Sequence, residues 1–450
     1  LTVTGRSAQR DDMPVNLLRL ALVVLLVVGT AGVGQRWHSQ REYRQNRNKL
    51  GHGGPRNVFP GAYHDSIDRQ NNNDTVENTM RNTFPALLLF IVSVAAQAET
   101  VLIENVRIFN GVDAKLASGN VLVRDGLIET ISGDPIAAPD DARVIAGNNR
   151  ILTPGFIDLH VHLTFQMPAE TMREHASAAG ARAVAMAKFY LDNGFTTIRD
   201  AGGTHPDLAR AFNSGNLYGP RVYPSGAVIS QTSGHGDTRM PHEANPAHIG
   251  ESGYDQSGFG VIADGVDAHL VAVRENLKNG ATQIKIMGGG GVMSDFDPIH
   301  SLQPSPAEIR AAVQAASDWG TYVLAHAYTA EAITRLVENG VKSIEHGLLI
   351  DDKAARLVKE KDAVISTQLY IFRKLLVSDY MTDFQKEKAD LVRAGQENLI
   401  RLIKKYDITT GFSTDFIFGE YAGLPGEFTE RALFWSNAEV LHQATAEGGE

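Results

Sequence analysis

Cysteine is absent from this chain of 450 residues. Disulfide bonds, thiolate zinc sites and cysteine nucleophiles are therefore excluded, and any metal ion must be held by His, Asp, Glu or a modified Lys. Basic residues are also in deficit, because 42 Lys and Arg stand against 52 Asp and Glu, for a net charge of -10. An acidic chain of this size is a poor nucleic-acid binder. We therefore expect no nucleic-acid partner.

Long hydrophobic runs are scarce as well. The apolar run at residues 20–34, LALVVLLVVGTAGVG, is shorter than the roughly 20 residues of a membrane span, although an anchor there remains an open alternative. The stretch that follows Met80 has the basic start, apolar centre and small residues of a secretory signal peptide cleaved after Ala98. We expect residues 1–79 to be an upstream segment outside the fold, residues 80–98 to be the signal peptide, and the protein to be periplasmic or secreted, without stable membrane association after cleavage.

The remaining chain predicts an α/β fold. Residues 99–153 alternate apolar and polar positions between Gly and Asp-Gly turns, which predicts the N-terminal part of a small β-domain. From residue 154 to 450, apolar strands alternate with helical patterns, and eight β/α units imply a closed (β/α)8 TIM barrel. A long loop at 231–260 is typical of a lid or binding loop, and one long helix is expected over 383–406. The eight strands are expected at 156–163, 195–203, 221–230, 283–291, 322–328, 342–350, 363–371 and 409–416.

Two histidines, His160 and His162, end the first expected strand of the barrel. Residues two apart on a strand face the same side. Two buried imidazoles side by side are unfavourable unless a partner holds them, and a divalent metal ion is the usual one. The pair therefore predicts a metal site.

Four further candidates lie on later strands. Lys285 is on the fourth, His326 and His346 end the fifth and sixth, and Asp415 ends the eighth. Because active sites of such barrels lie at the carboxyl ends of the strands, all of these side chains should converge with the histidine pair on one pocket. A lone strand histidine is more often a hydrogen-bonded core residue, but the ordered set favours a metal centre.

The runs PGFIDLHVHL, IKIMGGGGVMS, LAHAY, IEHG and STD resemble the metal-dependent amidohydrolase superfamily. The most similar branch is the imidazolonepropionase-like group, which includes Xaa-Pro and Xaa-Arg/Lys dipeptidases and ochratoxin-hydrolysing amidases. The likeness extends from residue 99 to the end. Members of the family carry a further segment after the last strand that completes the small domain, so the resemblance implies that this β-sandwich-like domain is incomplete here. It also implies a homo-oligomer.

The resemblance further implies two zinc ions, or other divalent metals, with a nucleophilic hydroxide between them. His160, His162 and Asp415 would hold one ion and His326 and His346 the other. Lys285 would be carboxylated and bridge both, while Asp415 would transfer the proton to the leaving amine. In the alternative reading, an unmodified Lys285 pairs with Asp415 or with a substrate carboxylate, and the site holds one metal.

Three residues are candidates for binding the substrate. His235 lies in the run SGHGD of the expected lid, which recurs in the dipeptidase branch and implies a hydrogen bond to a substrate carbonyl or carboxylate. The alternative is an exposed histidine in a glycine-rich turn. Tyr328 should share a strand face with His326 and orient the substrate carboxylate. Tyr370, on the expected seventh strand, is a weaker candidate, because a barrel tyrosine is more often a packing residue.

These expectations give a zinc-dependent hydrolase of amide bonds next to a C-terminal carboxylate. Dipeptides, N-acyl amino acids and ochratoxin-like amides fit as substrates. One alternative is a cyclic-amide or lactone hydrolase with the same metal site. A second is a truncated, non-catalytic remnant.

Overall fold

A computed structural model describes residues 99–166, 174–246, 255, 257–417 and 423–449. The predicted upstream segment and signal peptide lie outside these residues. Within them, every helix is too short or too polar to cross a membrane.

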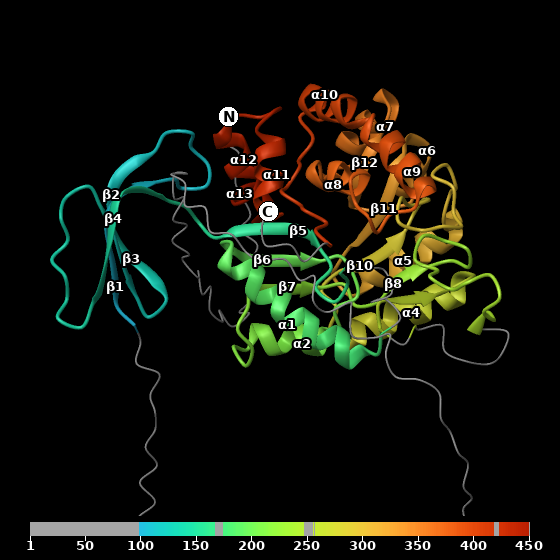
Figure 1. Ribbon diagram of the computed structural model, residues 1–450, viewed down its shortest axis with the longest axis horizontal. Helices are drawn as coiled ribbons and strands as arrows, with labels where there is room; N and C mark the ends of the chain where they lie inside the picture. Colours follow the sequence, from blue (N-terminus) through green and yellow to red (C-terminus); the bar gives the residue numbers. More distant parts are fainter. Residues whose placement is uncertain (1–98, 167–173, 247–254, 256, 418–422, 450) are drawn as a thin grey trace, which may run out of the picture. The chain divides into compact units, whose positions relative to one another are not determined.

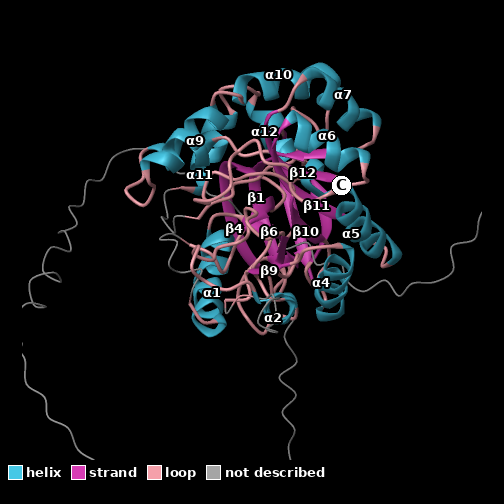
Figure 2. Ribbon diagram, turned by 90° about the vertical axis from the view of Figure 1, so that its right-hand side faces the viewer, coloured by secondary structure: helices cyan, strands magenta, loops and turns pink. Residues whose placement is uncertain are grey.

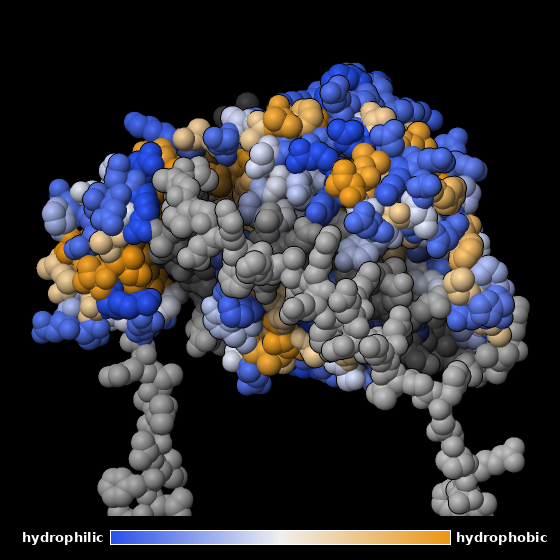
Figure 3. Space-filling view, in the orientation of Figure 1, coloured by the Kyte–Doolittle hydropathy of each residue, from blue (hydrophilic) through white to orange (hydrophobic). Residues whose placement is uncertain are grey.

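Residues 101–152 form a four-stranded sheet with the order β3-β2-β1-β4. Neighbouring strands are antiparallel except for β1 and β4, which are parallel. Alternation of side chains buries one set, including Ile103, Val106 and Val121, whereas Leu127 and Ile131 on β3 are exposed. Hydrophobic side chains gather over this sheet on the face seen in Figure 3. The strands are β1 (Val101–Ile108), β2 (Ala117–Arg124), β3 (Leu127–Ser132) and β4 (Arg143–Leu152).

Strands and helices alternate after β4, with the helices outside and the strands inside (Figures 1 and 2). The strands are β5 (Phe156–Val161), β6 (Phe195–Asp200), β7 (Arg221–Pro224), β8 (Val228–Ser230), β9 (Gly260–Ile262), β10 (Ile284–Met287), β11 (Val323–Thr329), β12 (Ser343–Leu349) and β13 (Val364–Ser366). The helices are α1 (Ala176–Asp192), α2 (Pro206–Asn213), α4 (Val266–Asn279), α5 (Pro306–Asp318), α6 (Ala330–Glu338), α7 (Asp352–Glu360), α8 (Tyr370–Leu376), α9 (Asp383–Arg393), α10 (Gln396–Tyr406), α11 (Leu424–Arg431), α12 (Asn437–Gln443) and α13 (Ala446–Gly449).

The inner strands form two parallel sheets, β5-β6-β7 and β13-β12-β11-β10-β8-β9. The expected third strand, 221–230, is divided between them as β7 and β8. The expected eighth strand, 409–416, is not a regular strand, but its backbone accepts from Ile365 through Thr409 (3.1 Å) and from Leu159 through Phe412 (2.9 Å). This segment therefore connects β13 to β5 by hydrogen bonds, where a closed ring of eight strands was expected.

The expected helix over 383–406 is two helices, and the prediction of one was wrong. α9 ends before Gly395 and α10 begins after it. A side chain at Gly395 would place its Cβ 2.1 Å from the carbonyl oxygen of Leu348, so the chain passes too close to β12 for any larger residue.

The expected seventh strand is also shorter than predicted. β13 ends at Ser366, and Tyr370 begins α8. The carboxylate of Glu427 accepts the backbone N–H groups of Leu369 (3.0 Å) and Tyr370 (2.8 Å). Because an anionic acceptor stabilises the start of a helix, this contact explains why the chain turns into α8 instead of extending the strand.

Candidate active site

A cavity of about 390 Å³ opens at the carboxyl ends of the inner strands. It is lined by all six predicted metal ligands, and by His235 and Tyr328. Tyr370 is not among these lining residues in the described part of the chain, and Arg373 lies over its ring; its role as a substrate residue stays a prediction. Residues that line the cavity are His160, His162, Phe165, His235, Asp237, Thr238, Met240, Phe259, Lys285, Met287, Val292, Met293, Ser294, Asp295, Phe296, His326, Tyr328, His346, Ile371, Phe372, Leu375, Asp415 and Ile417.

The first part of the cluster consists of His160, His162 and Asp415. The two Nε2 atoms lie 3.3 Å apart, and Asp415 Oδ1 lies 3.7 Å from the first and 3.6 Å from the second. Ligands about 2.0–2.2 Å from a tetrahedral zinc ion lie about 3.3–3.6 Å from one another. These three atoms therefore have the spacing of ligands that share one ion.

His160 is held by a buried carboxylate that the sequence did not single out. Its Nδ1 lies 2.6 Å from Glu345 Oε2, and the other oxygen of Glu345 accepts from Arg199 (2.8 Å) and from the Ser343 hydroxyl (2.6 Å). An ionised carboxylate can only accept, so Nδ1 carries the proton and Nε2 presents its lone pair. Such a partner fixes the ring and raises its basicity as a metal ligand.

The other histidines follow the same principle with carbonyl oxygens. His162 Nδ1 lies 2.8 Å from Gly202 O, and His346 Nδ1 lies 2.7 Å from Gln368 Oε1. In His326 the roles of the two ring nitrogens are exchanged, because here Nε2 lies 3.2 Å from Gly290 O. Each ring therefore donates from one nitrogen and keeps a lone pair on the other, as a metal ligand requires.

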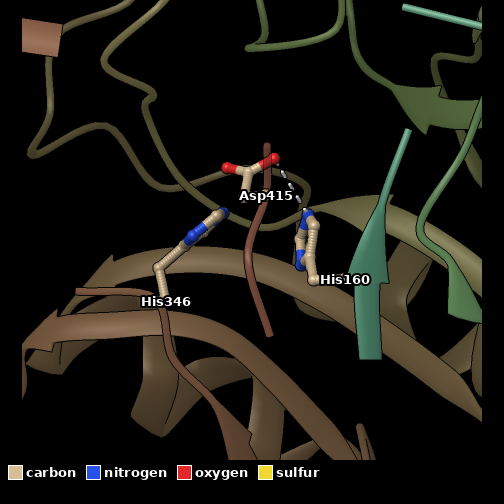
Figure 4. A group of neighbouring side chains, drawn as sticks. All are labelled: His160, His346 and Asp415. Carbon is tan, nitrogen blue, oxygen red and sulfur yellow. Dashed lines mark ion pairs between the residues drawn. The ribbon is translucent and has the colours of Figure 1, made fainter. Parts of the chain in front are cut away.

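Figure 4 shows His160, His346 and Asp415 directed toward one another, with ligand atoms all within 4.8 Å. His346 and Asp415 have positive φ angles of 75° and 48°. Residues other than Gly adopt this conformation rarely, and such strain concentrates at functional sites. The backbone N–H of Asp415 donates to the carbonyl oxygen of His160 (2.8 Å), which helps to hold Asp415 in this conformation.

Burial controls the charge of the cluster. It lowers the pKa of His162 to about 3 and that of His326 and His346 well below the ordinary value. Burial also lowers the pKa of Lys285, and it raises that of Asp415. The imidazoles are therefore neutral at neutral pH, which is their ligating form, and the amine of Lys285 is more easily deprotonated than a solvated one.

His235 lies over His326, with ring centroids 4.2 Å apart. Its ring Nδ1 is 2.7 Å from the Ser294 hydroxyl. Its backbone N–H donates to the side-chain oxygen Oε1 of Gln303 (2.9 Å). The glycine run, Gly288–Gly291, leaves room for the imidazole ring of His235, because a Cβ at Gly291 would lie 1.8 Å from the ring. Tyr328 is beside His326 at 4.8 Å between centroids.

The sequence pattern did not indicate the partners of two candidate ligands, Glu345 and Gln368. It also did not indicate the partners of His235, which are Ser294 and Asp297. Glu345 could have been found from its position. It lies directly before the predicted ligand His346 on a strand, SIEHGLL, whose other residues are mostly apolar. Arg199, on β6, donates to Glu345 Oε1 on β12 (2.8 Å), a contact between distant strands that a local sequence pattern does not indicate.

An α/β fold with four neutral histidines, a buried lysine and an aspartate at the carboxyl edge of parallel strands defines a hydrolase of the metal-dependent type. The model of the Amidohydrolase family matches residues 151–437. The chain belongs to this family and is a hydrolase acting on C–N bonds.

Known proteins of this family resemble the chain over most of its length. Ochratoxinase from Aspergillus niger is 28% identical over 375 residues, which cover 79% of this chain and 77% of that protein. Its crystal structure has a TM-score of 0.67, with 78% and 84% of the two chains covered. A prolidase complexed with N-methylphosphonate-L-proline is 33% identical, with a TM-score of 0.71 and 78% and 86% covered. A Xaa-Pro dipeptidase with bound methionine is 25% identical, with a TM-score of 0.67 and 78% and 87% covered.

Proposed function

We propose that the protein hydrolyses the amide bond of a small dipeptide or N-acyl amino acid with a free carboxylate, using two zinc ions. The observation that carries the proposal is the set of four histidine lone pairs on one cavity that also contains a buried lysine and an aspartate. The relatives named prolidase, Xaa-Pro dipeptidase and ochratoxinase support this substrate class.

His160, His162 and Asp415 would hold one ion, and His326 and His346 the other. When bound, divalent ions polarise the scissile carbonyl and lower the pKa of an attacking water. Lys285 would be a ligand shared by both ions as a carbamate, because a deprotonated amine is the form that adds to carbon dioxide with loss of a proton, and burial lowers the pKa of Lys285.

Asp415 acts as the proton carrier in this proposal. Its carboxylate accepts a proton from the water as the C–O bond forms, and returns it to the amide nitrogen as the C–N bond breaks. The products are a carboxylate and an amine. Burial raises the pKa of Asp415.

His235 and Tyr328 bind the polar end of the substrate. Nδ1 of His235 is occupied by Ser294, so Nε2 is the nitrogen available to the substrate carbonyl or carboxylate. Burial raises the pKa of Tyr328 well above its ordinary value, so its hydroxyl stays protonated and can donate to a carboxylate.

The cavity also has an apolar wall. It is formed by Ile371, Phe372 and Leu375 on α8, together with Met293 and Phe296. Burial of apolar area favours a substrate with a large apolar group by about 25 cal/mol per Å² removed from water. We therefore expect apolar acyl groups or N-terminal side chains to be preferred.

A substrate panel with controlled metal content tests this function. Chelated protein is restored with zinc and assayed with apolar N-acyl amino acids, their C-terminal amides, lactones and cyclic amides. The proposal predicts zinc-dependent turnover, with kcat/KM about 10²-fold lower for the C-terminal amides, because binding groups for the carboxylate lose their partner. Preference for lactones or cyclic amides would support the alternative hydrolase, and no turnover by zinc-loaded protein would support the remnant.

A further inference from the structure

Two side chains on one face of α9 donate hydrogen bonds to residues 291–297, a segment that begins at the last residue of the glycine run. Lys388, only 5% exposed, donates from Nζ to the carbonyl oxygens of Gly291, Ser294 and Asp297. Three residues earlier on the helix, Gln385 donates to Met293 O (2.7 Å) and Asp295 Oδ1 (3.1 Å). Residues three apart share a helix face, so α9 contacts this segment, the 291–297 loop, at nearly every residue.

The helix is itself organised for this contact. Gln385 belongs to a capping box in which its Oε1 accepts the N–H of Thr382 (3.0 Å) while Nε2 extends to the loop. A buried ammonium is unfavourable unless several acceptors surround it, and here the backbone of a single loop supplies them.

The other side of the 291–297 loop contacts His235. The Ser294 hydroxyl lies 2.7 Å from Nδ1. Asp297 Oδ2 lies 3.9 Å from the same atom and accepts the N–H of Gly291 (2.8 Å). Asp297 Oδ1 is buried and has no hydrogen-bond partner among the described residues. The ring therefore rests between the loop and His326, and its orientation depends on where the loop lies.

We propose that Lys388 and Gln385 are positioning residues for catalysis, because they fix the 291–297 loop so that Ser294 and Asp297 orient His235 toward the substrate. This inference rests on the proposed amide hydrolysis. The same loop carries Met293 and Phe296 of the apolar wall, so α9 sets both the polar contact and one side of the substrate pocket.

A double-mutant cycle tests the connection. We expect His235→Ala to lower kcat by about 10²-fold and Lys388→Met to lower it by about 10- to 100-fold through misplacement of the ring. In the double variant, kcat should equal that of His235→Ala, because the loop then has no ring to orient, while KM still rises through the displaced wall. Ser294→Ala leaves the Lys388 contacts intact. It should also lower kcat when His235 is present and have no further effect on kcat in the His235→Ala background.

Lys404→Met is the matched control, since Lys404 on α10 also donates to a backbone carbonyl, that of Phe434, and should leave kcat and KM unchanged. Additive losses of kcat in the cycle would overturn the inference, because a merely structural lysine acts independently of His235. Crystal structures of the wild type and Lys388→Met test the positioning without turnover: the ring should leave Ser294 in the variant, and an unmoved ring would contradict the inference. Absence of amide hydrolysis by the wild type would instead count against the proposed function.

Discussion

The two halves of the candidate metal centre are built from the same residue type but differ in what stands behind it. Behind His160, in the half completed by Asp415, is the ionised Glu345, at 2.6 Å and itself paired with Arg199. Behind His326 and His346 are neutral acceptors, Gly290 O at 3.2 Å and Gln368 Oε1 at 2.7 Å. We call these the charged half and the neutral half.

The identity of the ligands alone therefore does not determine the metal affinity of a site. Hydrogen bonds to an ionised acceptor are roughly twice as strong as neutral ones, and an anionic partner increases the electron density on the ligating nitrogen. In the charged half the three ligand atoms already lie 3.3 to 3.7 Å apart. We therefore expect the charged half to bind its ion more tightly than the neutral half.

The largest expected effect follows from removing the carboxylate that the charged half presents to the substrate. Asp415→Asn should lower kcat by about 10³-fold, because the amide cannot accept the proton of water. Steady-state kinetics with a saturating N-acyl amino acid checks this, with the exposed Asp318→Asn on α5 as control. Retention of more than a tenth of the wild-type rate would assign proton transfer to another group.

A smaller effect, on metal affinity, is expected when the histidine partners of the two halves are made alike. Glu345→Gln gives His160 a neutral partner, as Gln368 is for His346, and should weaken the tighter metal site by about 10- to 100-fold. Competition with a fluorescent chelator measures both affinities, and Glu338→Gln, on the exposed side of α6, is the matched control. If the weaker site lost affinity instead, the assignment of the charged half as the tight one would be wrong.

Acid should weaken metal binding by the charged half first and so reduce the difference in metal affinity between the two halves. Burial raises the pKa of Asp415 to about 7, so below that pH a proton competes with the ion, and affinity falls by about tenfold per pH unit. Burial lowers the pKa of His326 and His346 well below the ordinary value, so the neutral half meets no such competition until more acidic pH. Loss of a shared carbamate would weaken both halves equally. Equal pH slopes for the two sites would contradict this account.

The grouping of the candidate ligands around one cavity was predictable from the sequence, because they lie at strand ends and strand ends converge by topology. His160, His326 and His346 needed only the order of the strands. Glu345 was not predictable in the same way, since its contact to His160 joins β12 to β5 across 185 residues. Such a contact depends on which strands lie opposite, which a one-dimensional pattern does not contain.

Local competition explains the errors in the fold. Tyr370 continues an apolar run that reads as a strand, but the distant Glu427 stabilises a helix start at that position. The break at Gly395 is imposed by the carbonyl of Leu348, so helical periodicity on both sides predicted one helix where there are two. In both cases a tertiary contact outweighs the local pattern.

The most direct test of the central claim is the hydrolysis rate measured as zinc is added back to metal-free protein, with bound zinc counted per chain. The rate should rise with the filling of the weaker site and reach its maximum at two ions per chain. Full activity at one ion per chain, with the second site empty, would contradict a catalytic centre that joins the charged and neutral halves.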